Sequence, residues 1–228
     1  MNILNSKDKL FIVFLVSGHG GNLKFVQEYI KLNKIEHFEI LAVIADRECN
    51  AVEYAKKQKI NTHIIAYSKQ NPDNLCNMLS KYNPDIIISN WHKILDLNTV
   101  KSYKNKIINL HYSLLPAFSG MIGDKPIREA IKKNCKYVGT TVHYVNENVD
   151  DGEIIGQTII RVEDYNNFTL IMNKIFQDGA INLMNSIFYI VGHINNRPFS
   201  NGSVSISPPL CFDISKINSI FWQYLGII

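Results

Sequence analysis

Residues 10 to 32 read LFIVFLVSGHGGNLKFVQEYIKL, and this stretch decides the fold class. Residues 10 to 16 are an unbroken apolar run rich in Phe, Ile and Val, which is typical of a strand buried in a parallel sheet. The run ends at Ser17-Gly18. Beyond the turn, apolar residues recur at the spacing of one helix face: Leu23, Val26, Tyr29 and Ile30. A strand, a glycine-rich turn and a helix in this order indicate an α/β unit.

The same alternation continues along the first half of the chain. Further strands are expected at residues 38–45, 62–65, 86–89 and 107–110, and helices at 22–32, 51–58, 71–82 and 94–103. Strands that alternate with helices predict an α/β protein whose mostly parallel, twisted sheet carries helices on both faces. Ligands of such sheets bind at the carboxyl ends of the strands.

The second half of the chain has a different pattern. We expect a helix at residues 126–133, a β pair at 138–145 and 153–162, and a long amphipathic helix at 168–189. A hairpin at Asn201-Gly202 and a short helix at residues 212–224 would follow. We therefore predict a catalytic domain over residues 1–194 and a C-terminal segment, 195–228, packed on it.

Composition narrows the class of protein. The chain has 228 residues, is 46% hydrophobic and carries a net charge of +4 from dispersed basic residues, which favours an ordinary solvated surface over a nucleic-acid patch. Its four cysteines lack the short spacings of metal or redox sites, so we expect reduced thiols in a cytoplasmic protein and no metal. The apolar run near the N-terminus is too short for a membrane span, and no membrane partner is expected.

Polar side chains cluster at one strand end. Asn109 and His111 lie two residues apart at the end of an apolar run, so they point to the same side of an extended backbone. A turn at residues 148–152 adds the carboxylates Asp150 and Asp151. An amide, an imidazole and a carboxylate are the groups needed for acyl transfer to an amine without a covalent intermediate.

These motifs resemble a known family. The stretches 109–116 (NLHYSLLP), 139–145 (GTTVHYV) and 149–155 (VDDGEII), preceded by the loop Gly18–Leu23, are similar to the formyltransferases that use formyltetrahydrofolate. The resemblance covers roughly residues 10 to 190 and implies a Rossmann-like formyltransferase fold. It implies that Asn109 binds the formyl oxygen, that His111 supports the tetrahedral intermediate and that Asp150 is the catalytic carboxylate.

The resemblance also implies binding sites. For the co-substrate, 10-formyltetrahydrofolate, it implies the following contacts: Trp91, as a flat apolar wall, with His92, Lys93, Ile94, Leu95, Asn146 and Val149. The acceptor is expected to be a small phosphorylated amine. Backbone N–H groups of Gly20, Gly21 and Asn22 at a helix N-terminus would hold its phosphate, and Asp178 would contact its ribose.

Several alternatives stay open. Asp151 is the second choice for the carboxylate, and we expect Asp150 to raise the pKa of His111 by its charge. His143 is expected to be structural, and Ser113 lacks the flanking glycines of a hydrolase nucleophile. The acceptor is glycinamide ribonucleotide or a nucleotide-linked amino sugar. A non-catalytic folate- or nucleotide-binding relative is a further alternative, and a homodimer is left open.

Overall fold

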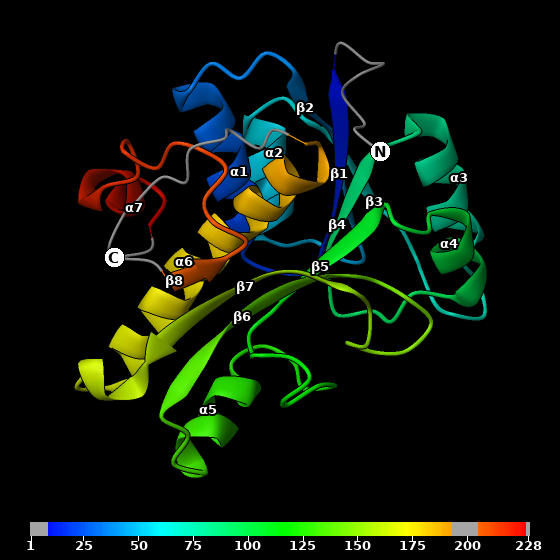
Figure 1. The fold of residues 1–228 in the computed structure, drawn as a ribbon. Helices are drawn as coiled ribbons and strands as arrows, with labels where there is room; N and C mark the ends of the chain where they lie inside the picture. The colour runs from blue at the N-terminus through cyan, green and yellow to red at the C-terminus, as the bar shows by residue number, and fades with distance from the viewer. Residues whose placement is uncertain (1–8, 193–204, 227–228) are drawn as a thin grey trace. The chain divides into compact units, whose positions relative to one another are not determined.

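The computed structural model describes residues 9–192 and 205–226 (Figure 1). Its described residues form two compact units. The N-terminal unit comprises residues 9–109 and 144–149, and the C-terminal unit comprises 110–143, 150–192 and 205–226. The division falls within a strand and not near residue 194, so the predicted domain boundary stays a prediction.

The N-terminal unit contains a parallel sheet with the strand order β3-β2-β1-β4-β5. The strands are β1 (Leu10–Val16), β2 (Phe38–Ala45), β3 (Asn61–Ile64), β4 (Ile86–Asn90) and β5 (Ile107–His111), whose last two residues belong to the C-terminal unit. The helices are α1 (Gly21–Leu32), α2 (Asn50–Lys57), α3 (Asp73–Tyr82) and α4 (Leu97–Ser102).

Both faces of this parallel sheet are covered. Side chains of a strand alternate between faces, and on the central strand β1 both sets are apolar and almost all are buried. Val13 and Leu15 of β1 pack in one cluster with Leu75 and Leu79 of α3. Helices α1 and α2 lie on the other side of the strands (Figure 1). The predicted α/β class, with a mostly parallel sheet and helices on both faces, is confirmed.

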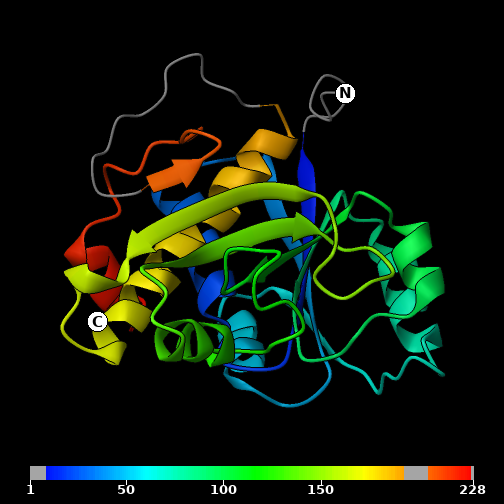
Figure 2. The same cartoon turned by 60° about the horizontal axis from the view of Figure 1, so that its bottom comes forward.

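The C-terminal unit is built on antiparallel pairing. Its elements are α5 (Lys125–Lys132), β6 (Tyr137–Tyr144), β7 (Ile154–Arg161), a 3-10 turn (Val162–Asp164), α6 (Phe168–Ile190), β8 (Ser205–Ser207) and α7 (Ser219–Tyr224). Strand β7 pairs antiparallel with β6 on one side and with β8 on the other. Helix α6 runs behind the β6–β7 pair (Figure 2).

Polar side chains hold α6 against the β6–β7 pair. Asn182 of α6 donates from Nδ2 to the carbonyl oxygen of Gly156 at 3.1 Å. A side chain at Gly156 would have no room, because its Cβ would lie 2.6 Å from Asn182 Oδ1 and 2.9 Å from Ser186 Oγ. The close approach of the helix to the strand therefore depends on this glycine.

The described part of the C-terminal segment packs on the same helix. The backbone N–H of Cys211 donates to Asn185 Oδ1 at 2.6 Å, and the Phe212 ring stacks on Phe188 at a centroid distance of 5.5 Å. Residues 211 and 212 thus contact α6, while the division of the chain into residues 1–194 and a segment 195–228 packed on them stays a prediction. The predicted hairpin at Asn201-Gly202 lies outside the described residues.

Two predicted helix starts are wrong, each because a capping residue sets a later one. Helix α4 begins at Leu97 and not at residue 94, since Asp96 accepts a hydrogen bond from the backbone of Thr99. Helix α7 begins at Ser219 and not at residue 212, since Asn218 accepts from the backbone of Phe221. The later start of α4 leaves residues 91–95 as a loop after β4.

Candidate active site

A buried imidazole and a carboxylate meet in the C-terminal unit. His111, the last residue of β5, is only 6% exposed, and its Nδ1 lies 3.3 Å from Oδ2 of Asp150. The backbone N–H of Gly120 donates to the same oxygen at 2.8 Å. The structure therefore shows the expected contact between His111 and Asp150. The catalytic roles of the two residues stay a proposal.

The turn geometry selects Asp150 over its neighbour. Asp150 has a φ of 54°, in the left-handed region that Asp tolerates better than most residues with a side chain. This backbone conformation accompanies a half-buried side chain that faces His111, whereas Asp151 is exposed. The contact with His111 supports Asp150 as the carboxylate of the pair.

Burial decides the protonation of His111. Desolvation lowers the pKa of His111 below its ordinary 6.5, and it outweighs the opposing effects of the Asp150 charge and the Phe118 carbonyl. The charge of Asp150 acts in the expected direction and raises the pKa of His111, but the larger effect of burial, which the expectation left out, makes the overall shift downward. His111 is therefore neutral near pH 7 and able to accept a proton.

Asp150 is the anionic partner of the pair. Burial acts to raise the pKa of its carboxyl, but contacts with His143, the Gly120 N–H and His111 outweigh burial and hold the pKa below its ordinary 3.8. A carboxylate that is ionised beside a neutral imidazole stabilises the imidazolium formed when that imidazole takes up a proton. The pair can therefore serve as a general base.

The second ring nitrogen of His111 also faces an oxygen. Its Nε2 lies 3.3 Å from the carbonyl oxygen of Phe118. A neutral imidazole has one N–H, so it can donate to Asp150 or to Phe118, whereas an imidazolium donates to both. The surroundings of the ring thus favour the protonated form geometrically, while its burial favours the neutral form.

A second histidine contacts the same carboxylate. His143 of β6 is 2% exposed, and its Nε2 lies 3.6 Å from Oδ1 of Asp150. A structural role is the expectation for this residue, because it lies inside a predicted strand. The signal that could have revealed the contact is a polar residue in a mostly buried strand that leads into the turn carrying Asp150.

Asn109 precedes His111 by two residues on β5 and is partly exposed. Within a strand this spacing places both side chains on one side of the backbone. The same strand therefore carries both the amide and the imidazole. Its role as the donor to a carbonyl oxygen stays a prediction.

The glycine-rich loop of the N-terminal unit has the expected form. Helix α1 begins at Gly21, and Gly20 before it has a φ of 72° and supplies no side-chain cap. A Cβ on Gly20 would lie 2.7 Å from the Cβ of Ala51, so only glycine fits. The first N–H groups of a helix have no partner within the helix and favour anions. This loop is suited to a phosphate.

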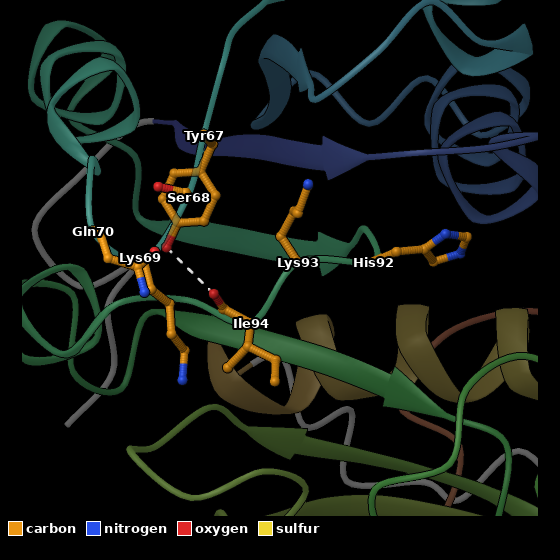
Figure 3. Close-up of a pocket in the computed structure, with 7 residues that line it drawn as sticks. All are labelled: Tyr67, Ser68, Lys69, Gln70, His92, Lys93 and Ile94. Carbon is orange, nitrogen blue, oxygen red and sulfur yellow. Dashed lines mark hydrogen bonds between the residues drawn. The ribbon is translucent and has the colours of Figure 1, made fainter.

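The loop after β4 forms part of an open pocket of about 380 Å³. Figure 3 shows its lining, which comes from two segments, Tyr67–Gln70 and His92–Ile94. The Tyr67 hydroxyl contacts the carbonyl oxygen of Ile94 at 3.4 Å and joins the two segments. The sequence predicted that His92–Ile94 would line a binding site, but it did not predict Tyr67–Gln70. Tyr67–Gln70 lies in the connection between β3 and α3, and the folding of this connection places it beside His92–Ile94.

Trp91 and Leu95, also expected to contact the folate, lie elsewhere. Both are 8% exposed and belong to the hydrophobic cluster that α3 and α4 cover. The Trp91 ring packs against Tyr67 at a centroid distance of 4.9 Å. Trp91 is therefore not among the residues that line this pocket, because the chain turns it into the core directly after β4.

The remaining expected residues lie in two places. Asn146 accepts the Asn148 N–H at 3.0 Å, and Val149 is 49% exposed. Asp178 of α6 is 1% exposed and contacts Lys174 Nζ through Oδ1 at 2.7 Å, while its Oδ2 has no partner among the described residues. Burial raises the pKa of Asp178 to about 6 despite Lys174. An unpaired carboxylate oxygen can accept a ligand hydroxyl.

Two classes of feature are missing from the described chain. Across residues 9–192 and 205–226, no group of three or more His, Cys, Asp or Glu side chains is placed to hold a metal ion. Within the same ranges, none of the helices has the length and apolar character needed to span a bilayer.

The fold and these sites define an α/β protein with a buried imidazole–carboxylate pair. The family model described as formyl transferase matches residues 10–187. The chain therefore belongs to the formyl transferase family.

Similar proteins carry two different names. Phosphoribosylglycinamide formyltransferase of Escherichia coli (strain K12) is 30% identical over 162 residues, which are 66% of this chain and 73% of that protein. Formyltetrahydrofolate deformylase of Bacillus subtilis (strain 168) is 35% identical over 143 residues, 59% of this chain and 45% of that protein. The chloroplastic phosphoribosylglycinamide formyltransferase of Arabidopsis thaliana is 29% identical over 66% of this chain, and the match spans 55% of its length.

A solved structure agrees in fold. Glycinamide ribonucleotide transformylase 1 from Symbiobacterium toebii superposes with a TM-score of 0.74 at 26% identity, over 88% of this chain and 95% of that one. This chain thus matches nearly all of one solved relative, but only about half the length of several curated relatives.

Proposed function

We propose that this protein transfers the formyl group of 10-formyltetrahydrofolate to the primary amine of a phosphorylated substrate, with glycinamide ribonucleotide as the first choice of acceptor. The observation that carries the proposal is the buried pair of His111 and Asp150 in a member of the formyl transferase family. Relatives named phosphoribosylglycinamide formyltransferase support the choice of acceptor.

The pair supplies the proton transfers of this reaction. The amine nitrogen bonds to the formyl carbon, the bond from that carbon to the folate nitrogen breaks, and one amine proton ends on the folate nitrogen. Neutral His111 accepts the proton and Asp150 stabilises the resulting imidazolium. The Asn109 amide donates to the formyl oxygen as negative charge develops there.

The pocket beside β4 fits part of the folate. His92, Lys93 and Ile94 were expected to hold the co-substrate, and they line the pocket with Tyr67–Gln70. A folate carries an apolar ring system and a glutamyl end with carboxylates. The aromatic ring of Tyr67 and the ammonium groups of Lys69 and Lys93 match these two kinds of surface. Asn146 and Val149 remain the other expected contacts.

The acceptor would use different groups. Backbone N–H groups of Gly20, Gly21 and Asn22 at the start of α1 would bind its phosphate. The unpaired oxygen of Asp178 would accept a hydroxyl of its sugar. Both assignments come from the resemblance.

A second candidate is hydrolysis of the same folate. Relatives named formyltetrahydrofolate deformylase are 33–35% identical to this chain. Water would then take the place of the amine, and His111 would take its proton. The nucleotide-linked amino sugar remains an alternative acceptor.

The experiment that tests these proposals uses the purified chain and 10-formyltetrahydrofolate. Three reactions run in parallel, with glycinamide ribonucleotide, with a dTDP-linked amino sugar and without amine, and both the formylated product and formate are measured. Formylated glycinamide ribonucleotide supports the first choice. Formate at the same rate in all three reactions would establish the deformylase instead. No consumption of the folate in any reaction, with folate binding intact, would leave the non-catalytic relative.

A further inference from the structure

The Asp150 carboxylate lies between two imidazoles. Its Oδ2 faces His111 Nδ1 at 3.3 Å and accepts the Gly120 N–H at 2.8 Å. Its Oδ1 faces His143 Nε2 at 3.6 Å. Oδ2 is thus in contact with His111, the proposed base, and with the backbone of Gly120. Oδ1 lies against His143, which has no part in the proposed mechanism so far.

The β6–β7 pair has a register irregularity beside His143. The β6–β7 register shifts between Val142 and His143: Val142 pairs with Gly156, but His143 pairs with Ile154, so β7 contains one extra residue. Such bulges re-aim side chains next to active sites. Here the bulge lies at the end of β6, and His143 is nearly fully buried against Asp150.

We propose that His143 is a positioning residue, which holds the Asp150 carboxylate in the orientation that directs Oδ2 at His111. The inference rests on the proposed function, since it assigns His143 a part in the same proton transfer. Rotation about the terminal torsion of an Asp side chain is soft, so contacts to both oxygens are needed to keep one of them in place. Gly120 and His111 hold Oδ2, and His143 holds Oδ1.

The charge of the carboxylate depends on the same neighbours. The titratable groups that face Asp150 are His111 from β5 and His143 from β6. Removing a donor from Oδ1 leaves that oxygen buried without compensation, which raises the pKa of Asp150. Asp150 then becomes protonated at a higher pH than in the wild type, and its charge no longer stabilises the His111 imidazolium.

The test compares two substitutions of His143. His143→Leu fills similar space without a donor, and His143→Gln restores an N–H donor. His63→Leu is the matched control, because His63 is also a partly buried strand histidine but contacts Tyr82 at 2.7 Å and not Asp150. Each variant is assayed for formyl transfer or formate release, and the Asp150 carboxyl is titrated by carbon-13 NMR.

We expect His143→Leu to lower kcat about ten- to a hundredfold with both KM values within about twofold. The titration of the Asp150 carboxyl should move up by about one pH unit. His143→Gln should recover most of both changes, and His63→Leu should show neither. If His143→Leu does not fold, His143→Asn, whose shorter side chain leaves the gap to Asp150 open, takes its place.

The outcomes separate this inference from the proposed function. An unchanged Asp150 titration in the donor-free variant would overturn the positioning role, whatever the activity. A kcat loss that His143→Gln fails to recover would also overturn it. Wild-type protein without any turnover would refute the proposed function, while the NMR titration would still report on the contact between His143 and Asp150.

Discussion

At the scale of single residues, the environment of His111 decides its chemistry more than the type of residue does. A surface histidine beside a carboxylate would gain charge, but burial of His111 outweighs Asp150 and lowers the pKa of the ring. Burial also acts against the ionised form of Asp150, but its contacts with His143, the Gly120 N–H and His111 outweigh burial and lower the pKa of the carboxyl. At neutral pH the imidazole of His111 is therefore neutral and the carboxylate of Asp150 is ionised.

The first prediction concerns Asn109. Replacing it with Ala removes the amide donor to the formyl oxygen, and kcat should fall by about two to three orders of magnitude. Binding of the folate, measured by calorimetry, should be nearly unchanged. Turnover close to that of the wild type would contradict the proposed role of Asn109 as the donor to the oxyanion.

The second prediction concerns the His111–Asp150 pair and pH. Because the neutral imidazole is the base, kcat should fall as the pH drops through the pKa of His111, which lies below 6.5. Asp150→Asn should cost nearly as much kcat as His111→Ala, and the double variant should be little worse than either. Additive losses in the double-mutant cycle would show that the residues act in separate steps. A large loss in Asp151→Asn alone would show that the wrong carboxylate was chosen.

At the scale of elements, the turns after the strands create the sites. The β1–α1 turn brings Gly20 against Ala51, and the later start of α4 leaves His92–Ile94 as a loop that lines a pocket with Tyr67–Gln70. These contacts join segments that are distant in sequence. Strands contribute directly as well, since His111 ends β5 and His143 lies in β6.

The third prediction tests the β1–α1 turn through Gly20→Ala. The added Cβ would lie 2.7 Å from Ala51 and occupy a positive φ, so the variant should lose about 1–3 kcal/mol of stability and show a higher KM for the acceptor. The KM for the folate should barely change. Gly18→Ala is the control for stability in urea unfolding, since its Cβ would meet nothing within 4 Å. Equal stability of the two variants would contradict the packing argument.

At the scale of the whole molecule, stability depends on buried residues of α6 and of the segment after residue 205, away from the proposed catalytic pair. Phe212 stacks on Phe188, and the backbone of Cys211 donates to Asn185, so both residues pack on α6. Asp178 lies buried in the same helix with a raised pKa. Both features make the free energy of unfolding sensitive to changes away from the proposed catalytic pair.

The fourth prediction follows from Asp178. Its folded pKa of about 6 exceeds the ordinary 3.8, so the folded state binds more protons between these values, and this group adds stability as the pH falls. Relative to Asp178→Asn, the wild type should gain roughly 1 kcal/mol of unfolding free energy between about pH 7 and pH 5. Urea unfolding at the two pH values measures the difference, and parallel pH dependences of the two proteins would contradict the assignment.

The fifth prediction concerns Phe212. Replacing it with Ala removes a buried ring that stacks on Phe188 and should cost about 3–5 kcal/mol of stability. Tyr224→Ala is the matched control, because Tyr224 is 70% exposed, and should cost less than about 1 kcal/mol. Equal losses of unfolding free energy in the two variants, measured by denaturant unfolding, would mean that Phe212 is not part of the hydrophobic core.

The order and type of the elements could be read from the sequence because their signals are local. The apolar run at 10–16 and the helical spacing after Asn22 depend only on backbone geometry, and both elements are found within a residue of the prediction. The contact of His111 with Asp150 was also predictable, since one residue ends a strand and the other lies in a turn that the resemblance marks. Capping by Asp96 and Asn218 was missed, although it too is local.

Only the tertiary structure decided the features that depend on distance in space. Trp91 was expected at the folate, but it is buried in the core because α3 and α4 close over it. His143 of β6 lies against Asp150, which comes seven residues later in the chain, and no sequence pattern marks this contact. The pKa of His111 is lowered by burial, which residues adjacent in sequence do not determine. Periodicity and turn chemistry are properties of adjacent residues, whereas desolvation and side-chain contact are set by segments that meet only after the chain has folded.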